Sequence, residues 1–155
     1  RERLEFEKIN VLYNISDFVM NISFAEGFGL GTLEAMQTGT PILAAKTGGL
    51  SRQVVDHRDG SENGVALDIE LKTLVGSQHV PYIYEDYVSV ESVSKGIMKL
   101  HELGKEGRGA LGQKSKKYVE DEFSYESTIR MWDETLKETI ENWEKRYTRW
   151  ECETL

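Results

Sequence analysis

Several residue types are scarce in this 155-residue chain, and each scarcity excludes a class of protein. Cys152 is the only cysteine, which rules out a disulfide framework and a thiolate metal site. The three histidines, His57, His79 and His101, lack the spacing of metal ligands, so we expect no bound metal. No stretch approaches the roughly 18 apolar residues of a membrane span, and no secretory leader is visible. We therefore expect a soluble protein of a reducing compartment, the cytoplasm by default.

Basic residues are also in the minority. The chain has 19 Lys and Arg against 27 Asp and Glu, a formal net charge of −8. Nucleic-acid binding needs a basic surface, so this balance argues against DNA or RNA as a partner. The length suits one domain with a genuine core, and there are no internal repeats or low-complexity tracts.

The most informative segment present is residues 26–34, Glu-Gly-Phe-Gly-Leu-Gly-Thr-Leu-Glu. The apolar run 17–23 before it predicts a short buried strand, and residues 30–37 have the composition of a helix that Gly39 and Pro41 end. Free N–H groups and the helix dipole at such a glycine-rich turn favour a phosphate. This arrangement predicts a protein that handles a sugar nucleotide.

Together with Leu12-Tyr13, Asp17, Ala35-Met36 and Gly48-Gly49, this segment resembles the retaining glycosyltransferases of family 4. Their hallmark is a Glu, seven residues and a second Glu, which are Glu26 and Glu34 here. The resemblance is strong over residues 9–55 and looser over 64–147. It implies the donor-binding C-terminal domain of a GT-B enzyme, an α/β Rossmann-like fold with a short parallel sheet, flanking helices and a long C-terminal helix.

At the sugar end of the donor, the resemblance gives Glu26 the catalytic position, where its carboxylate accepts hydrogen bonds from the hydroxyls of the sugar. The backbone amides of Gly27, Phe28 and Gly29 would donate to the same sugar, which only a glycine-rich backbone could approach closely. The alternative is that Glu26 is a solvated charge in a loop.

At the nucleotide end, the resemblance places the diphosphate against Leu30, Gly31 and Thr32 at the start of the helix. Glu34, one turn further on, would accept hydrogen bonds from the two ribose hydroxyls, a bidentate role that suits a carboxylate. The alternative is that Glu34 is an ordinary exposed helix residue. For the two glycines at 48 and 49, a plain turn and a place near the donor are equally good interpretations.

The implied reaction transfers a glycosyl group from a GDP- or UDP-sugar, with a mannosyl or glucosyl group as the guess, to an acceptor hydroxyl with retention. By resemblance, attack comes from the same face and the leaving diphosphate helps to deprotonate the acceptor. The protein then supplies positioning and electrostatic stabilisation, and needs no cofactor and no metal. The separated carboxylates do not fit glycoside hydrolysis, because Glu34 is expected to face the ribose.

Other parts of the family pattern are not found. The chain starts at Arg1 and not at a methionine, and the acceptor-binding N-terminal domain, the first donor-domain strands and the Arg and Lys that neutralise the diphosphate are missing. Lys46 and Arg52 do not match those positions, and the segment expected to hold the nucleobase lies upstream of Ile9. We therefore expect the C-terminal piece of a larger enzyme, inactive alone, whose partners are that N-terminal domain and a glycan, lipid or protein acceptor.

The remaining elements are predicted from apolar spacing. Residues 4–15 suggest a helix, residues 41–45 a buried strand with a turn after it at 47–49, and residues 65–67 a third strand. The inward positions of the first helix are taken to be Leu4, Phe6, Ile9, Leu12 and Ile15. Residues 68–89 look like an unusually long connection, functional or disordered. We expect the tyrosines of its 81–87 stretch to pack on the domain, in preference to stacking on an acceptor or partner.

Three helices are predicted to follow. The first carries Val90, Val93, Ile97 and Leu100 on one side, the second ends near Phe123, and the third begins after Ser124 as N-cap. The domain boundary is placed accordingly, with a partial donor-binding domain over residues 1–124 and a helix over 125–155 that crosses to the missing N-terminal domain.

That last helix carries an aromatic stripe. Its C-terminal part, Trp143, Tyr147 and Trp150, is expected to be exposed and prone to pair with a second copy, although a short coiled coil is also considered.

Two other functions compete with transfer. One is a non-catalytic module that binds a sugar nucleotide or regulates a partner, which the missing basic pair favours. The other is a fragment of a dinucleotide-binding oxidoreductase. We set it aside because Gly27, Gly29 and Gly31 have the wrong spacing for Gly-x-Gly-x-x-Gly and Glu34 comes too early for its acid. A purely structural role leaves the glycines and carboxylates unexplained.

Overall fold

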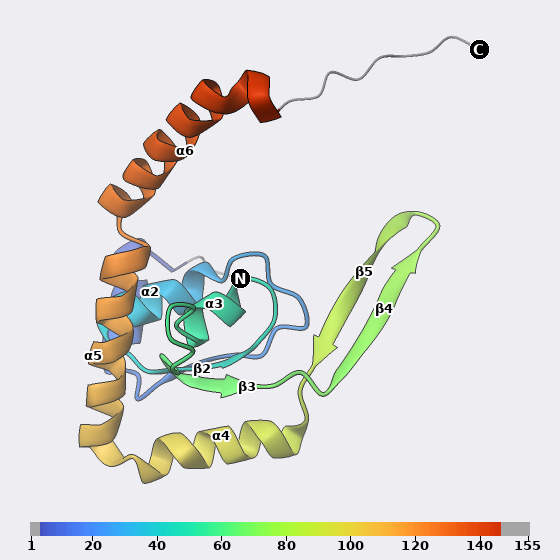
Figure 1. Ribbon diagram of the computed structural model, residues 1–155. Coiled ribbons are helices and arrows are strands. Elements are labelled where there is room, and N and C mark those ends of the chain that lie inside the picture. The colour runs from blue at the N-terminus through green and yellow to red at the C-terminus, as the bar shows by residue number, and fades with distance from the viewer. Residues whose placement is uncertain (1–3, 147–155) are drawn as a thin grey trace. The chain divides into compact units, whose positions relative to one another are not determined.

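The computed structural model describes residues 4–146 of the chain (Figure 1). It separates into two compact units, Arg1–Glu120 and Asp121–Leu155, each described by itself below. The first unit contains a parallel three-stranded sheet, an antiparallel hairpin and five helices, the last of which continues for two residues into the second unit.

The sheet consists of β1 (Val19–Asn21), β2 (Ile42–Ala45) and β3 (Val65–Leu67), in the order β1-β2-β3. All neighbours are parallel, with Val19 opposite Ile42 and Leu43 opposite Val65. All four residues of β2 are buried, as expected for a central strand covered on both faces. The three predicted strands are confirmed, although β1 is shorter than the apolar run 17–23.

The helices are α1 (Phe6–Ile15), α2 (Leu30–Thr38), α3 (Leu50–Val54), α4 (Val90–Glu102), α5 (Gly104–Glu122) and α6 (Tyr125–Arg146). Five of the six helices within the described residues fall where apolar spacing and caps predicted them, and the short helix α3 was not predicted. Gly39 ends α2 in a left-handed conformation at φ 78°, and its N–H donates to the carbonyls of the last turn. The Rossmann-like α/β fold with a long C-terminal helix is therefore confirmed.

Part of the core lies between the sheet and α4, and another part is formed by buried residues of α2 and α3. Leu43, Val65, Leu67 and Leu100 form one buried cluster. A Cβ added to Gly96 of α4 would lie 2.7 Å from Leu43 Cδ1, so the helix backbone packs directly on the strands. Figure 1 shows α4 on one side of the sheet and α2 and α3 on the other. Both faces of the sheet are therefore covered by helices.

The inward face predicted for α1 is largely wrong. Leu4, Leu12 and Ile15 are exposed, at 56%, 46% and 72% of their accessible surface. The helix contacts α2 on the side that carries Tyr13, and its apolar residues are spread around the remaining surface. Ile9 is half-buried, and the side chain of Phe6 lies outside the described residues.

The connection predicted over residues 68–89 is in fact a β-hairpin. Strands β4 (Leu71–Ser77) and β5 (Val80–Tyr87) pair antiparallel, with Leu71 opposite Tyr87. We missed it because Pro81 and the polar residues broke the expected alternation, while cross-strand pairs of β-branched and aromatic residues stabilise it.

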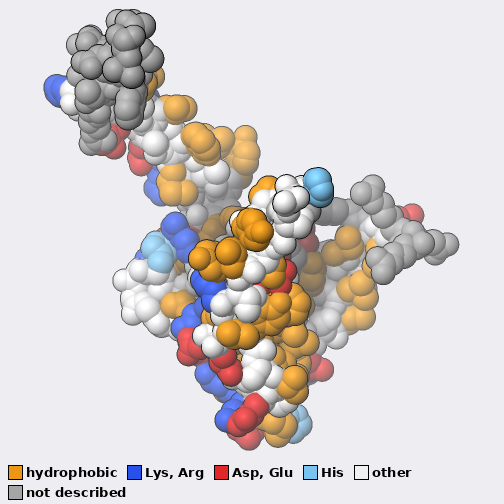
Figure 2. Space-filling model, turned by 90° about the vertical axis from the view of Figure 1, so that its right-hand side faces the viewer, with side chains coloured by type: hydrophobic (Ala, Val, Ile, Leu, Met, Phe, Trp, Pro, Cys, Tyr) orange, Lys and Arg blue, Asp and Glu red, His pale blue; other side chains and the backbone are white. Residues whose placement is uncertain are grey.

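The tyrosines of the hairpin do not all pack on the domain. Tyr82 and Tyr84 are 65% and 62% exposed, whereas Tyr87 is half-buried. Figure 2 views the right-hand side of Figure 1, and hydrophobic side chains gather near the centre of this face. The packing expected of all three tyrosines therefore holds only at the base of the hairpin. Val90, the first residue of α4, was predicted to be inward and is exposed, at 83%, so that prediction is wrong.

The second unit is dominated by α6. Its predicted N-cap is confirmed, because the Ser127 N–H donates to Ser124 Oγ at 3.2 Å. The apolar stripe of α6 is exposed at Ile129, Trp132, Leu136, Ile140 and Trp143. The predictions for Tyr147 and Trp150 concern residues beyond those described. Within residues 4–146, no helix combines the length and the apolar character that crossing a membrane requires.

Candidate functional site

The loop between β1 and α2 lies at the carboxyl edge of the sheet, against the turn that follows β2. The Gly49 N–H donates to the Glu26 carbonyl at 3.4 Å. A Cβ on Gly48, whose φ is +46°, would lie 1.7 Å from that same oxygen. A Cβ on Gly49 would lie 2.5 Å from the Phe28 carbonyl oxygen. Two backbones thus meet with no room for side chains, which explains both glycines and places their turn against Glu26.

Gly29 joins this loop to α2. It caps the helix in a left-handed conformation at φ 89°, where a Cβ would lie 2.5 Å from Leu50 Cδ2. Gln53, which is fully buried in α3, donates from Nε2 to the Phe28 carbonyl at 2.6 Å. The sequence assigns Gln53 no role, because α3 reads Leu-Ser-Arg-Gln-Val and nothing in that pattern distinguishes the buried polar residue from the exposed ones. Gly29 and Gln53 together fix the backbone of the Gly27–Gly29 stretch.

The first turn of α2 presents three backbone N–H groups. The first bond of the helix runs from the Leu33 N–H to the Gly29 carbonyl at 3.1 Å, so the N–H groups of Leu30, Gly31 and Thr32 precede the intrahelical ladder. The Thr32 side chain is buried and its hydroxyl accepts a hydrogen bond from Asn21 Nδ2 at 3.2 Å. The Leu30 side chain points to solvent, 66% exposed. These residues can therefore offer an anion their backbone, and not their side chains.

Glu34 is half-buried on the side of α2 that faces α1. Its Oε2 accepts a hydrogen bond from the Tyr13 hydroxyl at 2.9 Å. Burial, followed by this hydrogen bond and the negative charge of Glu34, raises the pKa of Tyr13 to about 12. Thr40 Oγ1 donates to the Tyr13 carbonyl at 2.9 Å and ties α1 to the start of β2. Tyr13 belongs to the motif, but the sequence assigns its side chain no role, because a contact between two separate helices leaves no local signal.

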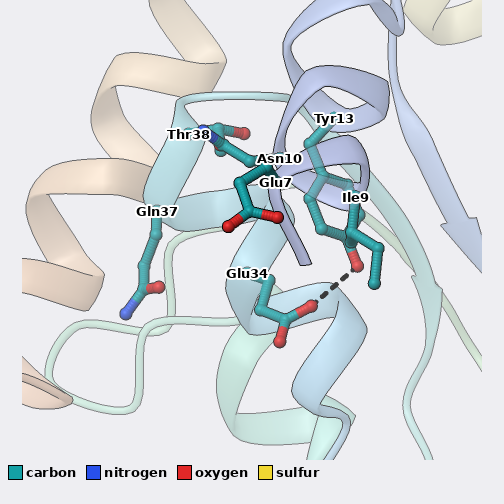
Figure 3. A pocket seen from close by; sticks show the side chains of 7 residues that line it. All are labelled: Glu7, Ile9, Asn10, Tyr13, Glu34, Gln37 and Thr38. Carbon is teal, nitrogen blue, oxygen red and sulfur yellow. Dashed lines mark hydrogen bonds between the residues drawn. The ribbon is translucent and has the colours of Figure 1, made fainter. Parts of the chain in front are cut away.

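A pocket of about 410 Å³ opens beside this pair. Figure 3 shows the hydrogen-bonded Glu34 and Tyr13 in it, with side chains of α1 and α2 around them. It is lined by Glu7, Ile9, Asn10, Tyr13, Glu34, Gln37 and Thr38. Apolar, amide and carboxylate groups thus surround one concave site, a mixture that suits a small organic ligand with hydroxyl groups.

The predicted residues follow one another along the chain, and the structure divides them among a loop, the first turn of α2 and the pocket. Glu26 to Gly29 form the loop, Leu30 to Thr32 the first turn, and Glu34 the wall of the pocket; Glu26 is not among the residues that line that pocket. Lys46 forms an ion pair with Asp68, and Arg52 Nη2 lies 3.3 Å from His57 Nε2. Within the described part of the chain, no group of three or more His, Cys, Asp or Glu side chains could hold a metal ion.

The sequence matches the family described as Glycosyl transferases group 1 over residues 3–70, which contain α1, the glycine-rich turn and the pocket. The D-inositol 3-phosphate glycosyltransferase of Paenarthrobacter aurescens is 48% identical over 48 residues. That match covers 31% of this chain and 12% of the relative. The chain therefore spans only a small part of the length of the curated relative it matches.

Two solved structures share the fold. Sucrose-phosphate synthase from Thermosynechococcus elongatus superposes with a TM-score of 0.66 at 19% identity, covering 90% of this chain and 29% of that one. The catalytic domain of Starch Synthase IV from Arabidopsis thaliana, solved with ADP and acarbose bound, gives a TM-score of 0.62, also at 19% identity, over 90% of this chain and 26% of that one. At these identities the likeness establishes the Rossmann-like α/β fold of GT-B glycosyltransferases. The sequence matches then relate the chain to the group 1 glycosyltransferases.

Proposed function

We propose that this chain carries the nucleotide-sugar site of a retaining glycosyltransferase, which transfers a glycosyl group from a GDP- or UDP-sugar to an acceptor hydroxyl. The observation that carries the proposal is the succession, along one segment of the chain, of a glycine-rich loop, three N–H groups at the start of α2 and the Glu34 carboxylate beside a pocket. The donor is a substrate, so no cofactor is needed.

The nucleotide end is built on α2. The N–H groups of Leu30, Gly31 and Thr32 and the helix dipole would hold the diphosphate. Glu34 would accept from the ribose hydroxyls, since a carboxylate has about four acceptor positions and Tyr13 occupies one of them. The adjoining pocket has room for part of a nucleoside. Among the neighbours, the starch synthase structure was solved with ADP bound, which supports a nucleoside diphosphate as the ligand class.

The sugar end is built on the loop. Glu26 is half-buried, and its backbone is held against the turn at Gly48 and Gly49. Its carboxylate would accept from the donor hydroxyls, with the amides of Gly27, Phe28 and Gly29 donating to the same sugar. Leaving-group charge would build on the diphosphate at the start of α2, where fixed dipoles stabilise it without reorganising. The diphosphate itself would take the acceptor proton, so that the acceptor attacks from the same face.

The alternative function is a module that binds a sugar nucleotide without catalysis. It is favoured by the missing basic pair, since Lys46 is paired with Asp68 and Arg52 lies against His57, and neither contact is with the start of α2. Under either function we propose three partners: an acceptor or regulated protein, a further domain that packs on α6, and a second copy that pairs through the exposed stripe of α6. Binding is common to both functions, so it is the property to test first.

The test is calorimetric titration of the chain with GDP, UDP and ADP, repeated with Glu34→Ala and with the control Glu91→Gln. Glu91 lies in α4 and pairs with Lys95 at the surface. Loss of charge-assisted hydrogen bonds should weaken binding of the preferred nucleotide about 10- to 100-fold in Glu34→Ala. The control should bind like the wild type. Equal affinity in all three proteins would remove the ribose role of Glu34, and no binding by the wild type would overturn the proposed site.

A further inference from the structure

The hairpin that sequence reasoning missed returns, at its base, to the loop that carries Glu26. The Asp86 N–H in β5 donates to the Phe24 carbonyl at 2.7 Å. The next residue, Tyr87, stacks its ring on that of Phe24, with centroids 4.4 Å apart and planes at 29°. A backbone bond and a ring contact therefore fix the loop two residues before Glu26.

The Asp86 side chain contacts the turn after β2, which lies against the loop that carries Glu26. Its Oδ2 accepts from the Thr47 hydroxyl at 2.8 Å, and Lys72 Nζ lies 3.2 Å from its Oδ1. The carboxylate is only 12% exposed and Thr47 is buried. The Thr47 hydroxyl and the Lys72 charge lower the pKa of Asp86, so it remains ionised at neutral pH and keeps both contacts.

Thr47 is the first residue of the Thr47–Gly49 turn, whose backbone contacts the Glu26 carbonyl. The two residues after it are Gly48, which leaves no space beside the Glu26 carbonyl oxygen, and Gly49, whose N–H donates to that oxygen. The Leu50 N–H closes the turn on the Thr47 carbonyl at 3.1 Å. Asp86 thus holds the Glu26 loop from two directions, through Phe24 before Glu26 and through the Thr47–Gly49 turn beside it.

We infer that Asp86 is a positioning residue for the sugar end of the donor site, which couples the hairpin to the loop carrying Glu26. The inference rests on the proposed function and adds a specific consequence to it. Asp86 touches neither the first turn of α2 nor Glu34 in any of its bonds, so its loss should disturb recognition of the sugar and spare the nucleoside diphosphate. A residue that merely stabilised the fold would affect both ligands alike.

The test uses Asp86→Ala and Thr47→Val, which remove opposite partners of one hydrogen bond. Glu70→Gln is the matched control, because Glu70 also sits at the base of the hairpin but bonds Ser89 and Ser92 at the start of α4. Thermal unfolding of each variant checks that it folds. If Asp86→Ala does not fold, the milder Thr47→Val still tests the same hydrogen bond. Each protein is titrated with GDP, GDP-mannose, UDP and UDP-glucose.

Asp86→Ala and Thr47→Val should each weaken binding of the preferred nucleotide sugar about tenfold, the effect of losing one charged hydrogen bond. Affinity for the matching nucleoside diphosphate should change less than about twofold, and Glu70→Gln should bind both ligands like the wild type. Amide hydrogen exchange of residues 24–29 without ligand should speed up in the first two variants only.

Equal losses for nucleotide and nucleotide sugar, or unchanged exchange in the loop, would overturn the positioning role while leaving the proposed site intact. A wild-type chain that binds none of the four ligands would overturn the donor site itself, and with it any role of Asp86 in donor recognition. The wild-type titration separates these two failures.

Discussion

Replacing Gly112 by alanine should destabilise the chain, although alanine is the better helix former. Gly112 lies within α5, where a Cβ would be 1.9 Å from the Gly39 carbonyl oxygen and 2.8 Å from its carbonyl carbon. Real Cβ atoms essentially never come closer than 3.0 Å to such atoms, so α5 would have to move away by more than an ångström. The obstacle is backbone at the end of α2, which cannot rotate aside as a side chain can.

Two opposing effects set the magnitude of this change. The gain in helix propensity from glycine to alanine is about 1 kcal/mol, and overpacking costs about 1–3 kcal/mol. Because the clash is with backbone, we take the upper half of that cost and expect a net loss of about 1–2 kcal/mol. Gly109, one turn earlier in α5, has nothing within 4 Å of a Cβ, so Gly109→Ala should stabilise by about 0.5–1 kcal/mol.

Urea denaturation followed by circular dichroism measures both changes in the free energy of unfolding. The identical substitution at two positions of one helix should therefore act with opposite sign. If Gly112→Ala stabilised the chain as much as Gly109→Ala, the close packing of α5 on the turn after α2 would be wrong.

Three further predictions concern ionisation and the glycine turn. A neighbouring guanidinium lowers the pKa of Asp56 from 3.8 to about 2, so its stabilising effect is present above about pH 4 and lost as pH falls towards 2. Asp56→Asn should accordingly cost stability at pH 7 and cost progressively less from pH 4 to pH 2 in urea titrations. The Tyr13 phenol should titrate near pH 12 by NMR of labelled tyrosine rings, and at a lower pH in Glu34→Gln; a wild-type value near 10 would contradict the buried hydrogen bond. Gly48→Ala should weaken nucleotide-sugar binding about tenfold by calorimetry. Gly60→Ala, which also lies at a positive φ (+77°) but in open space, should leave affinity unchanged.

The elements that sequence reasoning found are those with local signals. The strand over residues 42–45 is a continuous apolar run, and α2 has a glycine before it and Gly39 after it. The site residues from Glu26 to Glu34 are contiguous, so placing the turn between a strand and a helix also placed them. The structure also explains why residues 48 and 49 are glycines, because their backbone lies against the backbone of the loop that carries Glu26.

The features that were missed depend on contacts between distant parts of the chain. Tyr13 meets Glu34 across 21 residues, and Asp86 meets Thr47 across 39. The hairpin was missed because strand pairing is set by the partner strand as much as by its own sequence. The inward face of α1 was wrong because a helix that packs on a single neighbour buries a narrower stripe than its apolar residues suggest.

The most direct test of the central claim is an NMR titration of the isotope-labelled chain with GDP and UDP, following backbone amides. A nucleotide site on α2 predicts the largest saturable shifts at Leu30, Gly31 and Thr32, with smaller ones around Glu34 and Tyr13. Shifts confined to other elements, or no saturable shift with either nucleotide, would contradict the assignment of this turn as the donor site.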